Sequence, residues 1–443
     1  MKTLIKNCKI INEGDLYVSD ILIKDQFIDK IAKNINDSTA TIIDAKGKYA
    51  MPGVIDDQVH FREPGLTHKG DIASESRAAV AGGVTSFMEM PNVKPPSITI
   101  KDLEKKYAIA SKNSVANYSF YMGATNDNFK ELMKVDPKNH CGVKIFMGSS
   151  TGNMLVNDEK TIRKIFAESP VLVAIHSEDD RIIAKNLQEA MLEYGQNIPF
   201  ELHSDIRSVE ACLEMTKFAI SIAEEHDTKL HILHITTEEE LALFDNSIAL
   251  KDKRITAEAC SHHLWFDRDD YEEYGSLIKC NPAIKEYRHK KALLKAVLDD
   301  RIDVIASDHA PHTIAEKSNQ YLAAPSGIPL VQHSLAIMLE LSKQGKILLD
   351  HVVEKMCHNP AILFQIEKRG FLREGYYADV VLFDLNHEWK VSPDNILYKC
   401  EWSPFEGKKF TSKVTDTFVS GNHVYSDGQI ISDEAGMRLQ FER

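Results

Sequence analysis

The sequence predicts an α/β fold, a (β/α)8 barrel of the TIM type, with a small β-sandwich domain built from both ends of the chain. Three observations lead to this prediction. The middle of the chain alternates short apolar runs with amphipathic helical segments. These runs lie between residues 53 and 311, a span close to the roughly 250 residues typical of such barrels. Both ends of the chain instead hold short alternating runs separated by polar turns.

Composition excludes several classes of protein. The 443 residues are 43% hydrophobic and 27% charged, as in an ordinary soluble globular protein. A formal net charge of −13 argues against a nucleic acid or an anionic membrane as partner. No stretch reaches the roughly 18 apolar residues of a membrane span, and charge comes too early for a signal peptide. The seven cysteines are scattered without a Cys-x-x-Cys pair, so we expect a reduced, cytoplasmic protein.

The two ends of the chain predict one domain. The first part contains LIKNCKIIN, DILIKDQFIDKIA and ATIIDAKGKYA, and the last part contains ADVVLFDL and TSKVTDTFVSGNHVYSDG. Apolar alternation between polar turns is typical of short β-strands. We therefore predict that residues 1–50 and 361–443 form the small β domain and that residues 51–360 form the barrel.

Eight apolar runs are the predicted barrel strands, and helical patterns occur in the gaps, for example at 68–81, 98–112 and 205–225. A doubly wound parallel sheet is the alternative, because strands that alternate with helices are compatible with either fold. The runs are residues 53–60, 84–90, 117–123, 142–148, 171–176, 229–236, 254–260 and 303–311.

Polar side chains close several of these runs. His60, His176 and His234 end the first, fifth and sixth runs, and Asp308 lies in the eighth. The carboxyl ends of barrel strands form one rim that hosts the active site, so we expect these side chains to converge. Imidazoles and a carboxylate are the ligands of a zinc-type hydrolytic site. A lone strand histidine is more commonly a hydrogen-bonded core residue, and we assign that role to His231, on the opposite strand face from His234.

Lys144 lies inside the fourth run, GVKIF. A buried ammonium is costly unless an acid pairs with it, and such an ion pair is the simpler explanation. The functional alternative is that burial lowers its pKa, so that the neutral amine adds carbon dioxide. The resulting carbamate is an anion that can bridge two metal ions. Asp308 could likewise pair with a neighbouring base, but we favour metal binding and acceptance of a proton from a bridging water.

The motifs resemble the amidohydrolase superfamily, and within its cyclic amidohydrolases the dihydroorotase family is the most similar. The resemblance implies the reversible cyclisation of N-carbamoyl-L-aspartate to L-dihydroorotate in de novo pyrimidine (UMP) biosynthesis. It covers nearly the whole chain, because IIDAKGKYAMPGVID, REGYYADVVLFD and VSGNHVYSDG also fit the family's composite β domain. The central motifs are PGVIDDQVHFREPG, AGGVTSFMEMPN, GVKIFMG, HILHIT, TAEACSHH and ASDHAPHTIAEK.

The resemblance also implies how the rim binds metal. One or two Zn²⁺ ions per subunit are expected, two being favoured, with Lys144 as N6-carboxylysine between them. His60 and Asp308 would hold an inner metal ion, and His176 and His234 an outer one. A hydroxide that bridges the metals would attack the ring carbonyl group, with Asp308 as general base. The partners implied are the small-molecule substrate and a second copy in a homodimer.

Four further residues match the family's substrate contacts. Arg62, two residues past His60, offers a guanidinium fork for the substrate carboxylate. Asn92 and His312 match the rest of the carboxylate pocket, and Asn281 matches a contact to the ring. Taken alone, an arginine is commonly a solvated charge and an asparagine a turn residue. Arg62 favours a dihydroorotase over the alternative, a hydantoinase or allantoinase, because those relatives bind neutral or differently charged rings.

Two departures from the family pattern concern function. Gln58 replaces the first histidine of a His-x-His pair, so it is expected either to offer its amide oxygen to the inner metal ion or to hydrogen-bond beside it. Either way the inner metal should bind less tightly. Gln58 is also the one support for a non-enzyme alternative, an inactive structural partner of a transcarbamoylase.

The second departure is in the loop after the eighth run. SGIPLVQHS differs from the family's Gly-rich substrate loop, which leaves the contacts near Gly327 and the role of residues 313–330 open.

The resemblance also bears on the loop after the fourth run. Some dihydroorotases lack the lysine and use an acid just after this strand. Here GSSTGN has no carboxylate before Asp158 and Lys144 is present, which favours a lysine carbamate as the bridge.

Overall fold

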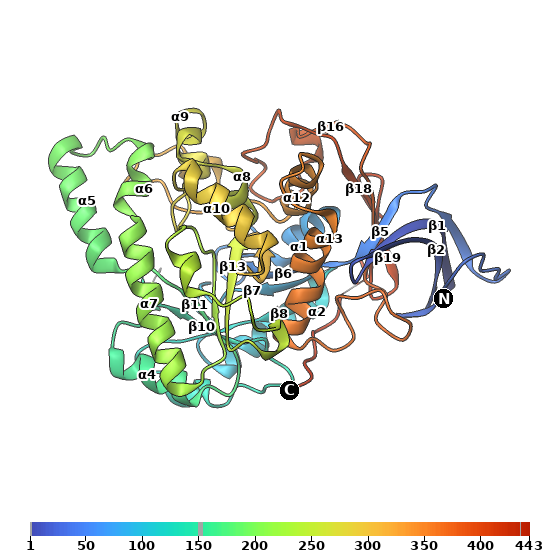
Figure 1. Cartoon of the computed structure of the whole chain (residues 1–443), viewed down its shortest axis with the longest axis horizontal. Coiled ribbons are helices and arrows are strands. Elements are labelled where there is room, and N and C mark those ends of the chain that lie inside the picture. Colours follow the sequence, from blue (N-terminus) through green and yellow to red (C-terminus); the bar gives the residue numbers. More distant parts are fainter. Residues whose placement is uncertain (1, 149–153, 435) are drawn as a thin grey trace.

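A computed structural model describes residues 2–148, 154–434 and 436–443. The chain forms a barrel surrounded by helices, with a β domain packed at one side (Figure 1). Strands from the two ends of the chain lie together in that domain, blue beside red. Most of the GSSTGN loop lies outside the described residues. Over the described ranges, no helix combines the length and apolar character needed to cross a bilayer.

The barrel strands pair in chain order, and all eight predicted runs contain one of them. The barrel closes where Val59 pairs with His309 in parallel and the His60 amide donates to the His309 carbonyl (2.7 Å). The barrel prediction is therefore confirmed, and the doubly wound sheet is wrong. The strands are β6 (Val54–Val59), β7 (Val84–Glu89), β8 (Asn117–Phe120) with its continuation β9 (Met122–Gly123), β10 (Val143–Phe146), β11 (Val173–His176), β12 (Leu230–Ile232), β13 (Ile255–Cys260) and β14 (Val304–Ala306).

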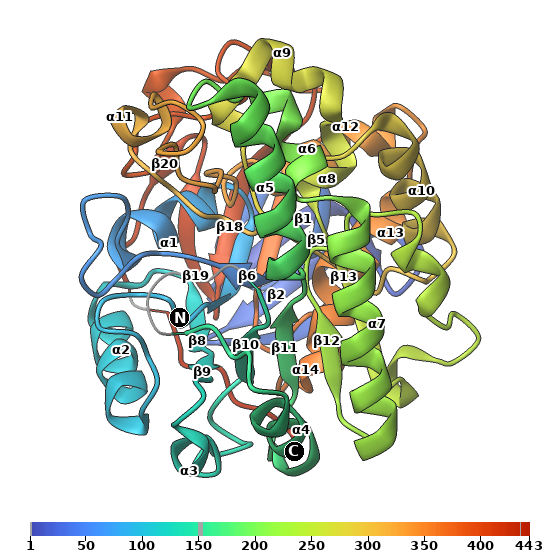
Figure 2. The same cartoon turned by 90° about the vertical axis from the view of Figure 1, so that its left-hand side faces the viewer.

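Helices cover the outside of the barrel (Figure 2). The three quoted helical patterns are present, each beginning two to four residues later than predicted. The reason is that Asp71, Thr99 and Ser208 keep extended backbone and cap the first turn through side-chain oxygens. The longer helices are α1 (Ile72–Ala81), α2 (Ile100–Asn113), α4 (Glu159–Glu168), α5 (Asp180–Tyr194), α7 (Val209–His226), α10 (Tyr287–Leu298) and α12 (Ser334–Lys343).

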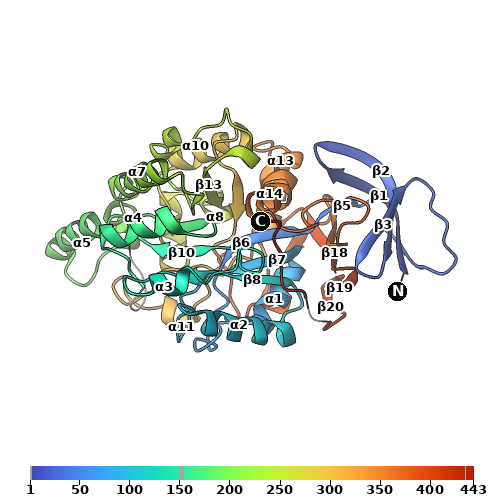
Figure 3. The same ribbon diagram turned by 90° about the horizontal axis from the view of Figure 1, so that it is seen from below.

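The β domain is a nine-stranded mixed sheet that draws on both chain ends (Figure 3). Its two parts meet where β15 pairs antiparallel with both β5 and β18. The prediction that both termini build this domain is confirmed. Its strands are β1 (Lys2–Asn12), β2 (Asp15–Lys24), β3 (Phe27–Ala32), β4 (Thr41–Asp44), β5 (Tyr49–Pro52), β15 (Val380–Asp384), β18 (Lys413–Val419), β19 (Asn422–Ser426) and β20 (Gln429–Ile430).

The last residues of the chain leave the β domain and return to the barrel. The Tyr118 amide, on β8, donates to the Met437 carbonyl (2.9 Å), and the Leu439 amide donates to the Tyr118 carbonyl (3.0 Å). The segment 361–443, which the sequence assigns to the β domain as a whole, is thus divided between the two parts.

A buried ion pair joins the β domain to the barrel. Arg369 pairs with Asp379, and the two side chains are only 3% and 4% exposed. The same carboxylate accepts hydrogen bonds from Asn117 Nδ2 on β8 (3.1 Å) and from the Ser420 amide (2.7 Å). The Asp379 side chain therefore ties Arg369 and Ser420, both in the C-terminal part of the chain, to a barrel strand.

Removing the cation of this pair should destabilise the protein. We predict that Arg369→Met costs about 3–5 kcal/mol, because Asp379 would remain as a buried, uncompensated charge. Urea denaturation followed by tryptophan fluorescence measures the loss. Lys409→Met is the matched control, since Lys409 and its partner Glu388 are both exposed and such pairs contribute little. Equal shifts in the two variants would contradict the assigned role.

Candidate active site

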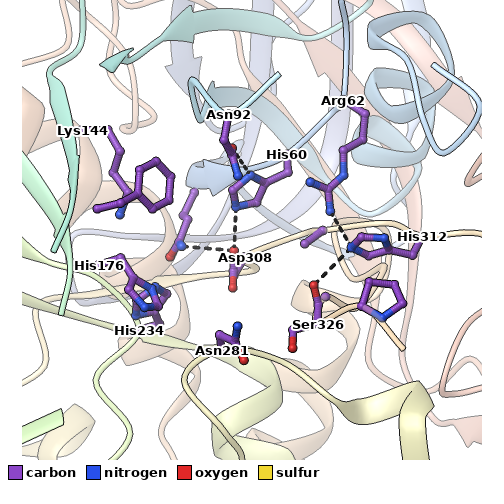
Figure 4. A pocket seen from close by; sticks show the side chains of 15 residues that line it. His60, Arg62, Asn92, Lys144, His176, His234, Asn281, Asp308, His312 and Ser326 are labelled. Carbon is purple, nitrogen blue, oxygen red and sulfur yellow. Dashed lines mark hydrogen bonds and ion pairs between the residues drawn. The ribbon is translucent and has the colours of Figure 1, made fainter. Parts of the chain in front are cut away.

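The residues predicted for the site meet in one pocket of about 300 Å³ at the carboxyl ends of the barrel strands (Figure 4). The rest of its wall comes from Phe146, Ala310 and residues 325–327. The ten predicted residues that line it are Gln58, His60, Arg62, Asn92, Lys144, His176, His234, Asn281, Asp308 and His312.

Three of these residues have a positive φ angle, a backbone conformation that residues other than glycine rarely adopt. Arg62, His234 and Asp308 have φ angles of 70°, 43° and 47°. Each lies just beyond a strand, where the chain turns sharply and directs the side chain into the pocket. A left-handed conformation at a non-glycine residue is strained and persists only where the surroundings enforce it, which is common at functional sites.

The outer pair of histidines has the geometry of two ligands on one metal ion. His176 Nδ1 and His234 Nε2 lie 3.1 Å apart. Two imidazole nitrogens at about 2.0–2.1 Å from one zinc ion would be separated by a similar distance. His234 Nδ1 is buried and has no hydrogen-bond partner among the described residues. These two side chains therefore fit a shared cation.

Glu178 orients His176 from behind. Its Oε2 lies 2.9 Å from His176 Nε2, an ion-pair distance that favours a proton on this nitrogen and the lone pair on Nδ1. Burial raises the pKa of Glu178, but the Arg207 guanidinium and His176 outweigh burial and lower it to about 2. A carboxylate behind a ligating histidine is the usual arrangement in metal sites. The sequence analysis missed Glu178, although its place two residues after a predicted ligand was the available signal.

The inner pair shows a contact between two acceptors. His60 Nδ1 donates to Asn92 Oδ1 (2.8 Å), which leaves the lone pair on Nε2. That nitrogen faces Asp308 Oδ1 at 3.1 Å. Burial lowers the pKa of His60 despite the neighbouring carboxylate, which favours the neutral ring. A neutral imidazole lone pair and a carboxylate oxygen at this distance are placed to share a cation, which an inner metal ion would provide.

Asn92 thus supports a ligand as well as lining the pocket. Its carbonyl oxygen is engaged by His60, so the amide N–H group is the part that remains to meet a substrate. The predicted substrate contact stays a prediction.

Gln58 hydrogen-bonds beside the inner pair. Its Nε2 donates to Asp308 Oδ1 (3.1 Å), and its Oε1 accepts a long contact from the Cys260 thiol (3.8 Å). The amide oxygen therefore points away from Asp308. Of the two roles predicted for Gln58, this arrangement corresponds to the second, and coordination through oxygen would require the amide to turn over.

Lys144 is buried, and no acid among the described residues forms an ion pair with it. Its side chain is 1% exposed, and Nζ has no hydrogen-bond partner among the described residues. Burial lowers its pKa to about 7, although Glu258 and Asp308 oppose the shift. Among the described residues, Lys144 therefore lacks the ion pair that would be the simpler explanation of a buried lysine. Because its pKa is about 7, a large share of its side chain is a neutral amine near pH 7.

A buried network lies beside these ligands. His231 Nε2 pairs with Asp57 (3.1 Å), and Nδ1 contacts Thr256 Oγ1 (2.8 Å). Burial lowers the pKa of His231, but Asp57 and Glu258 raise it overall to about 9. The protonated His231 ring has a polar partner at each nitrogen, which fits the structural role predicted for it. In the described ranges, Asp57, His231 and Glu258 form one of two buried groups close enough to hold a metal ion, the other being Cys260, His262 and His263.

The opposite side of the pocket is cationic. Arg62 is 7% exposed, its Nε donates to the Pro311 carbonyl (3.1 Å), and no described carboxylate pairs with it. Burial lowers its pKa to about 10, which leaves it charged at neutral pH. Arg62 and His312 Nε2 lie 3.1 Å apart. Behind them Lys69, which the sequence analysis did not single out, contacts His312 Nδ1 at 3.0 Å. An unpaired, buried guanidinium is a binding site for an anion.

The loop 313–330 forms a fixed wall of the pocket. Lys317 is buried and donates to three carbonyl groups, those of Lys279, Pro325 and Gly327 (3.0–3.1 Å). Gly327 has a φ of 143°, and a side chain there would lie 2.5 Å from the Ala310 carbonyl. Only glycine therefore lets the wall approach the last strand so closely.

Asn281 lies two residues after Lys279, whose carbonyl group accepts one of the Lys317 hydrogen bonds described above. Its Oδ1 is 3.2 Å from His203 Nε2, and its side chain reaches the pocket. The ring contact predicted for it stays a prediction.

Comparisons with known proteins match this geometry. A sequence model described as the amidohydrolase family matches residues 49–424. A curated protein named dihydroorotase from Halobacterium salinarum is 33% identical over 96% of this chain and 98% of its own length. A second, from Thermococcus kodakarensis, is 30% identical over 100% and 99%. Among solved structures, the L-hydantoinase (dihydropyrimidinase) from Arthrobacter aurescens is 26% identical, with a TM-score of 0.94 over 99% of both chains.

Restoring an imidazole at position 58 should strengthen the inner metal site. We predict that Gln58→His raises affinity for its second metal equivalent by about tenfold or more, since an imidazole lone pair replaces an amide turned to Asp308. Chelator competition followed by metal analysis measures this. Gln26→His, which adds an exposed histidine in the β domain, is the control. Unchanged affinity would place residue 58 outside the metal's ligand sphere.

Proposed function

The chain belongs to the amidohydrolase family, and on this premise we propose that it is a dihydroorotase, which interconverts N-carbamoyl-L-aspartate and L-dihydroorotate. It is a hydrolase of cyclic amides, as its dihydroorotase and hydantoinase relatives are. The observation that carries the choice of substrate is Arg62, a buried guanidinium with no carboxylate partner in the described chain. A substrate with a free carboxylate supplies that partner, whereas a neutral ring leaves a buried charge uncompensated.

The ligand set supports two metal ions, and we propose zinc for both. His60 and Asp308 would hold one ion and His176 and His234 the other, with carboxylated Lys144 between them. Bound metal ions would supply Lewis acidity to the ring carbonyl and lower the pKa of water. Asp308 accepts a proton from the attacking water and passes it to the departing ring nitrogen. In ring closure the same carboxylate moves the proton in the opposite direction.

The carboxylation of Lys144 follows from its burial. Nζ attacks carbon dioxide, a C–N bond forms, and the amine loses a proton to solvent. The product is an anion in place of a cation, beside two ligand pairs that each call for a cation. Its support is the pKa near 7 and the absence of a counter-ion among the described residues.

The two alternatives have less support. A hydantoinase-type activity accords with the similarity of fold, but it leaves Arg62 without a function. An inactive partner of a transcarbamoylase would not need paired ligand nitrogens, a supporting Glu178 and a Lys144 without a described ion-pair partner in one pocket.

We also propose that the protein is cytoplasmic and forms a homodimer. The first part rests on seven buried, unpaired cysteines, and the second on the family resemblance alone, which sedimentation of the purified chain tests.

The activity is tested with purified protein loaded with zinc. We expect about two metal ions per chain and hydrolysis of L-dihydroorotate. Asp308→Asn should lose turnover by about a thousandfold or more, because an amide cannot accept the proton. Asparagine tolerates the positive φ at this position, so the fold should persist, which circular dichroism checks. A metal-free wild type that stays inactive after zinc or manganese is added would refute the proposal.

Arg62 separates the dihydroorotase from the hydantoinase hypothesis. Arg62→Met should raise the KM for L-dihydroorotate about 10- to 100-fold, the size of a lost hydrogen bond between charged groups. The KM for 5,6-dihydrouracil, which has the same ring without the carboxylate, should change little. Steady-state kinetics on both substrates measures the difference. Equal effects would mean that Arg62 does not bind the carboxylate.

A further inference from the structure

The imidazole of His312 has three polar neighbours at hydrogen-bond distance that cannot all be satisfied at once, and Glu316 Oε2 lies farther away, 3.6 Å from Nδ1. Lys69 Nζ lies 3.0 Å from Nδ1. The Ser326 carbonyl and Arg62 Nη2 both lie 3.1 Å from Nε2. Lysine and arginine can only donate, and a carbonyl oxygen can only accept. A neutral imidazole has one N–H group and one lone pair, so its proton position decides which contacts are hydrogen bonds.

The neutral form of the ring follows from its surroundings. His312 is 7% exposed. Burial and the neighbouring Arg62 and Lys69 hold the pKa of His312 far below its usual range. The ring therefore carries one proton throughout the neutral pH range, and the choice is between two tautomers.

Counting contacts selects one tautomer. With the proton on Nε2, the ring donates to the Ser326 carbonyl and accepts from Lys69, and Arg62 Nη2 is left without an acceptor. With the proton on Nδ1, the ring accepts from Arg62 alone, and its N–H group faces the Lys69 ammonium at 3.0 Å, whereas Glu316 Oε2 at 3.6 Å is too far to accept a hydrogen bond. The first tautomer satisfies two contacts and the second satisfies one. Lys69 itself is held by Glu316 Oε1 at 3.0 Å, so its ammonium is anchored beside the ring.

We propose that Lys69 is a positioning residue that fixes the proton of His312 on Nε2, so that His312 and Arg62 both present N–H donors to one substrate carboxylate. This rests on the proposed function and extends it. Lys69 is not among the pocket-lining residues, and its effect passes through the ring between them. On binding, a carboxylate oxygen replaces the Ser326 carbonyl as acceptor for Nε2–H, and Arg62 Nη2 gains the acceptor it lacks.

The proton position can be read directly by ¹⁵N NMR. In zinc-loaded protein labelled at histidine, a nitrogen with a proton and one with a lone pair resonate far apart. His312→Gln identifies the signals by their loss. The wild type should show the proton on Nε2. Lys69→Met should move it, in part or wholly, to Nδ1, where Nε2 accepts from Arg62. Lys69→Arg should keep the wild-type tautomer.

Kinetics supply the second measurement. Lys69→Met should raise the KM for L-dihydroorotate about tenfold with kcat changed less than about threefold, and leave 5,6-dihydrouracil unaffected. Lys69→Arg should restore most of the loss. Lys94→Met is the control, since Lys94 is an exposed neighbouring cation that lowers the pKa of Lys69 but has no hydrogen bond to His312 among the described residues.

The outcomes separate this inference from the proposed function. An unchanged tautomer in Lys69→Met overturns the inference, whatever the substrate. An equal loss on both substrates, or the same loss in Lys94→Met, also overturns it. If the wild type does not act on L-dihydroorotate, the proposed function fails, and the imidazole resonances still decide the role of Lys69.

Discussion

The seam between the first and last barrel strands is the contact on which the site depends. Val59 pairs with His309 there, and the His60 amide donates to the His309 carbonyl at 2.7 Å. The His309 side chain is itself fixed, since Nε2 donates to Glu75 (2.8 Å) and Nδ1 accepts from the Leu330 amide (2.9 Å). One buried residue, His309, therefore joins the chain just after β14 to β6 through its backbone, and to α1 and the end of the loop 313–330 through its side chain. Ligands that are about 250 residues apart in sequence reach hydrogen-bond distance because this seam is closed.

Two kinds of unmatched polar group divide the pocket. On one side, atoms that can act as metal ligands lie 3.1 Å apart, as at His60 and Asp308 and at the outer histidines. On the other side, the buried Arg62 guanidinium donates to the Pro311 carbonyl but pairs with no described carboxylate. Buried polar groups are nearly always paired, so each side specifies its missing partner. The first calls for cations and the second for an anion. A cyclic amide that carries a carboxylate places its reacting carbonyl on the first side and its charge on the second.

Much of the fold, and the set of residues that meet in the pocket, could be predicted because both follow local rules. Apolar runs of the right length marked the barrel strands, and polar residues at their ends marked the rim. Glu178 and Lys69 escaped notice for a different reason. Each acts on a histidine only through tertiary contact, and in sequence Glu178 looks like an acid before a helix and Lys69 like a loop cation. The course of residues 436–443 was also unpredictable, because a short segment without periodicity gains its place only from tertiary contacts, here with β8 and with the backbone of Lys138, Gln365 and Glu367.

Gln58 can be understood from the oxygen it engages. Its amide and His60 both contact Oδ1 of Asp308, and no described side chain makes a hydrogen bond or ion pair with Oδ2. One oxygen is thereby held on the ligand side, which leaves the other free for proton transfer. Gln58 Oε1 in turn faces the Cys260 thiol, so the amide has a neighbour on each side that fixes its direction. An imidazole at this position would bind metal more tightly but would leave Asp308 with one fewer hydrogen-bond donor. The residue that looked like a lost ligand thus supports, by a hydrogen bond, the carboxylate that we propose as the general base.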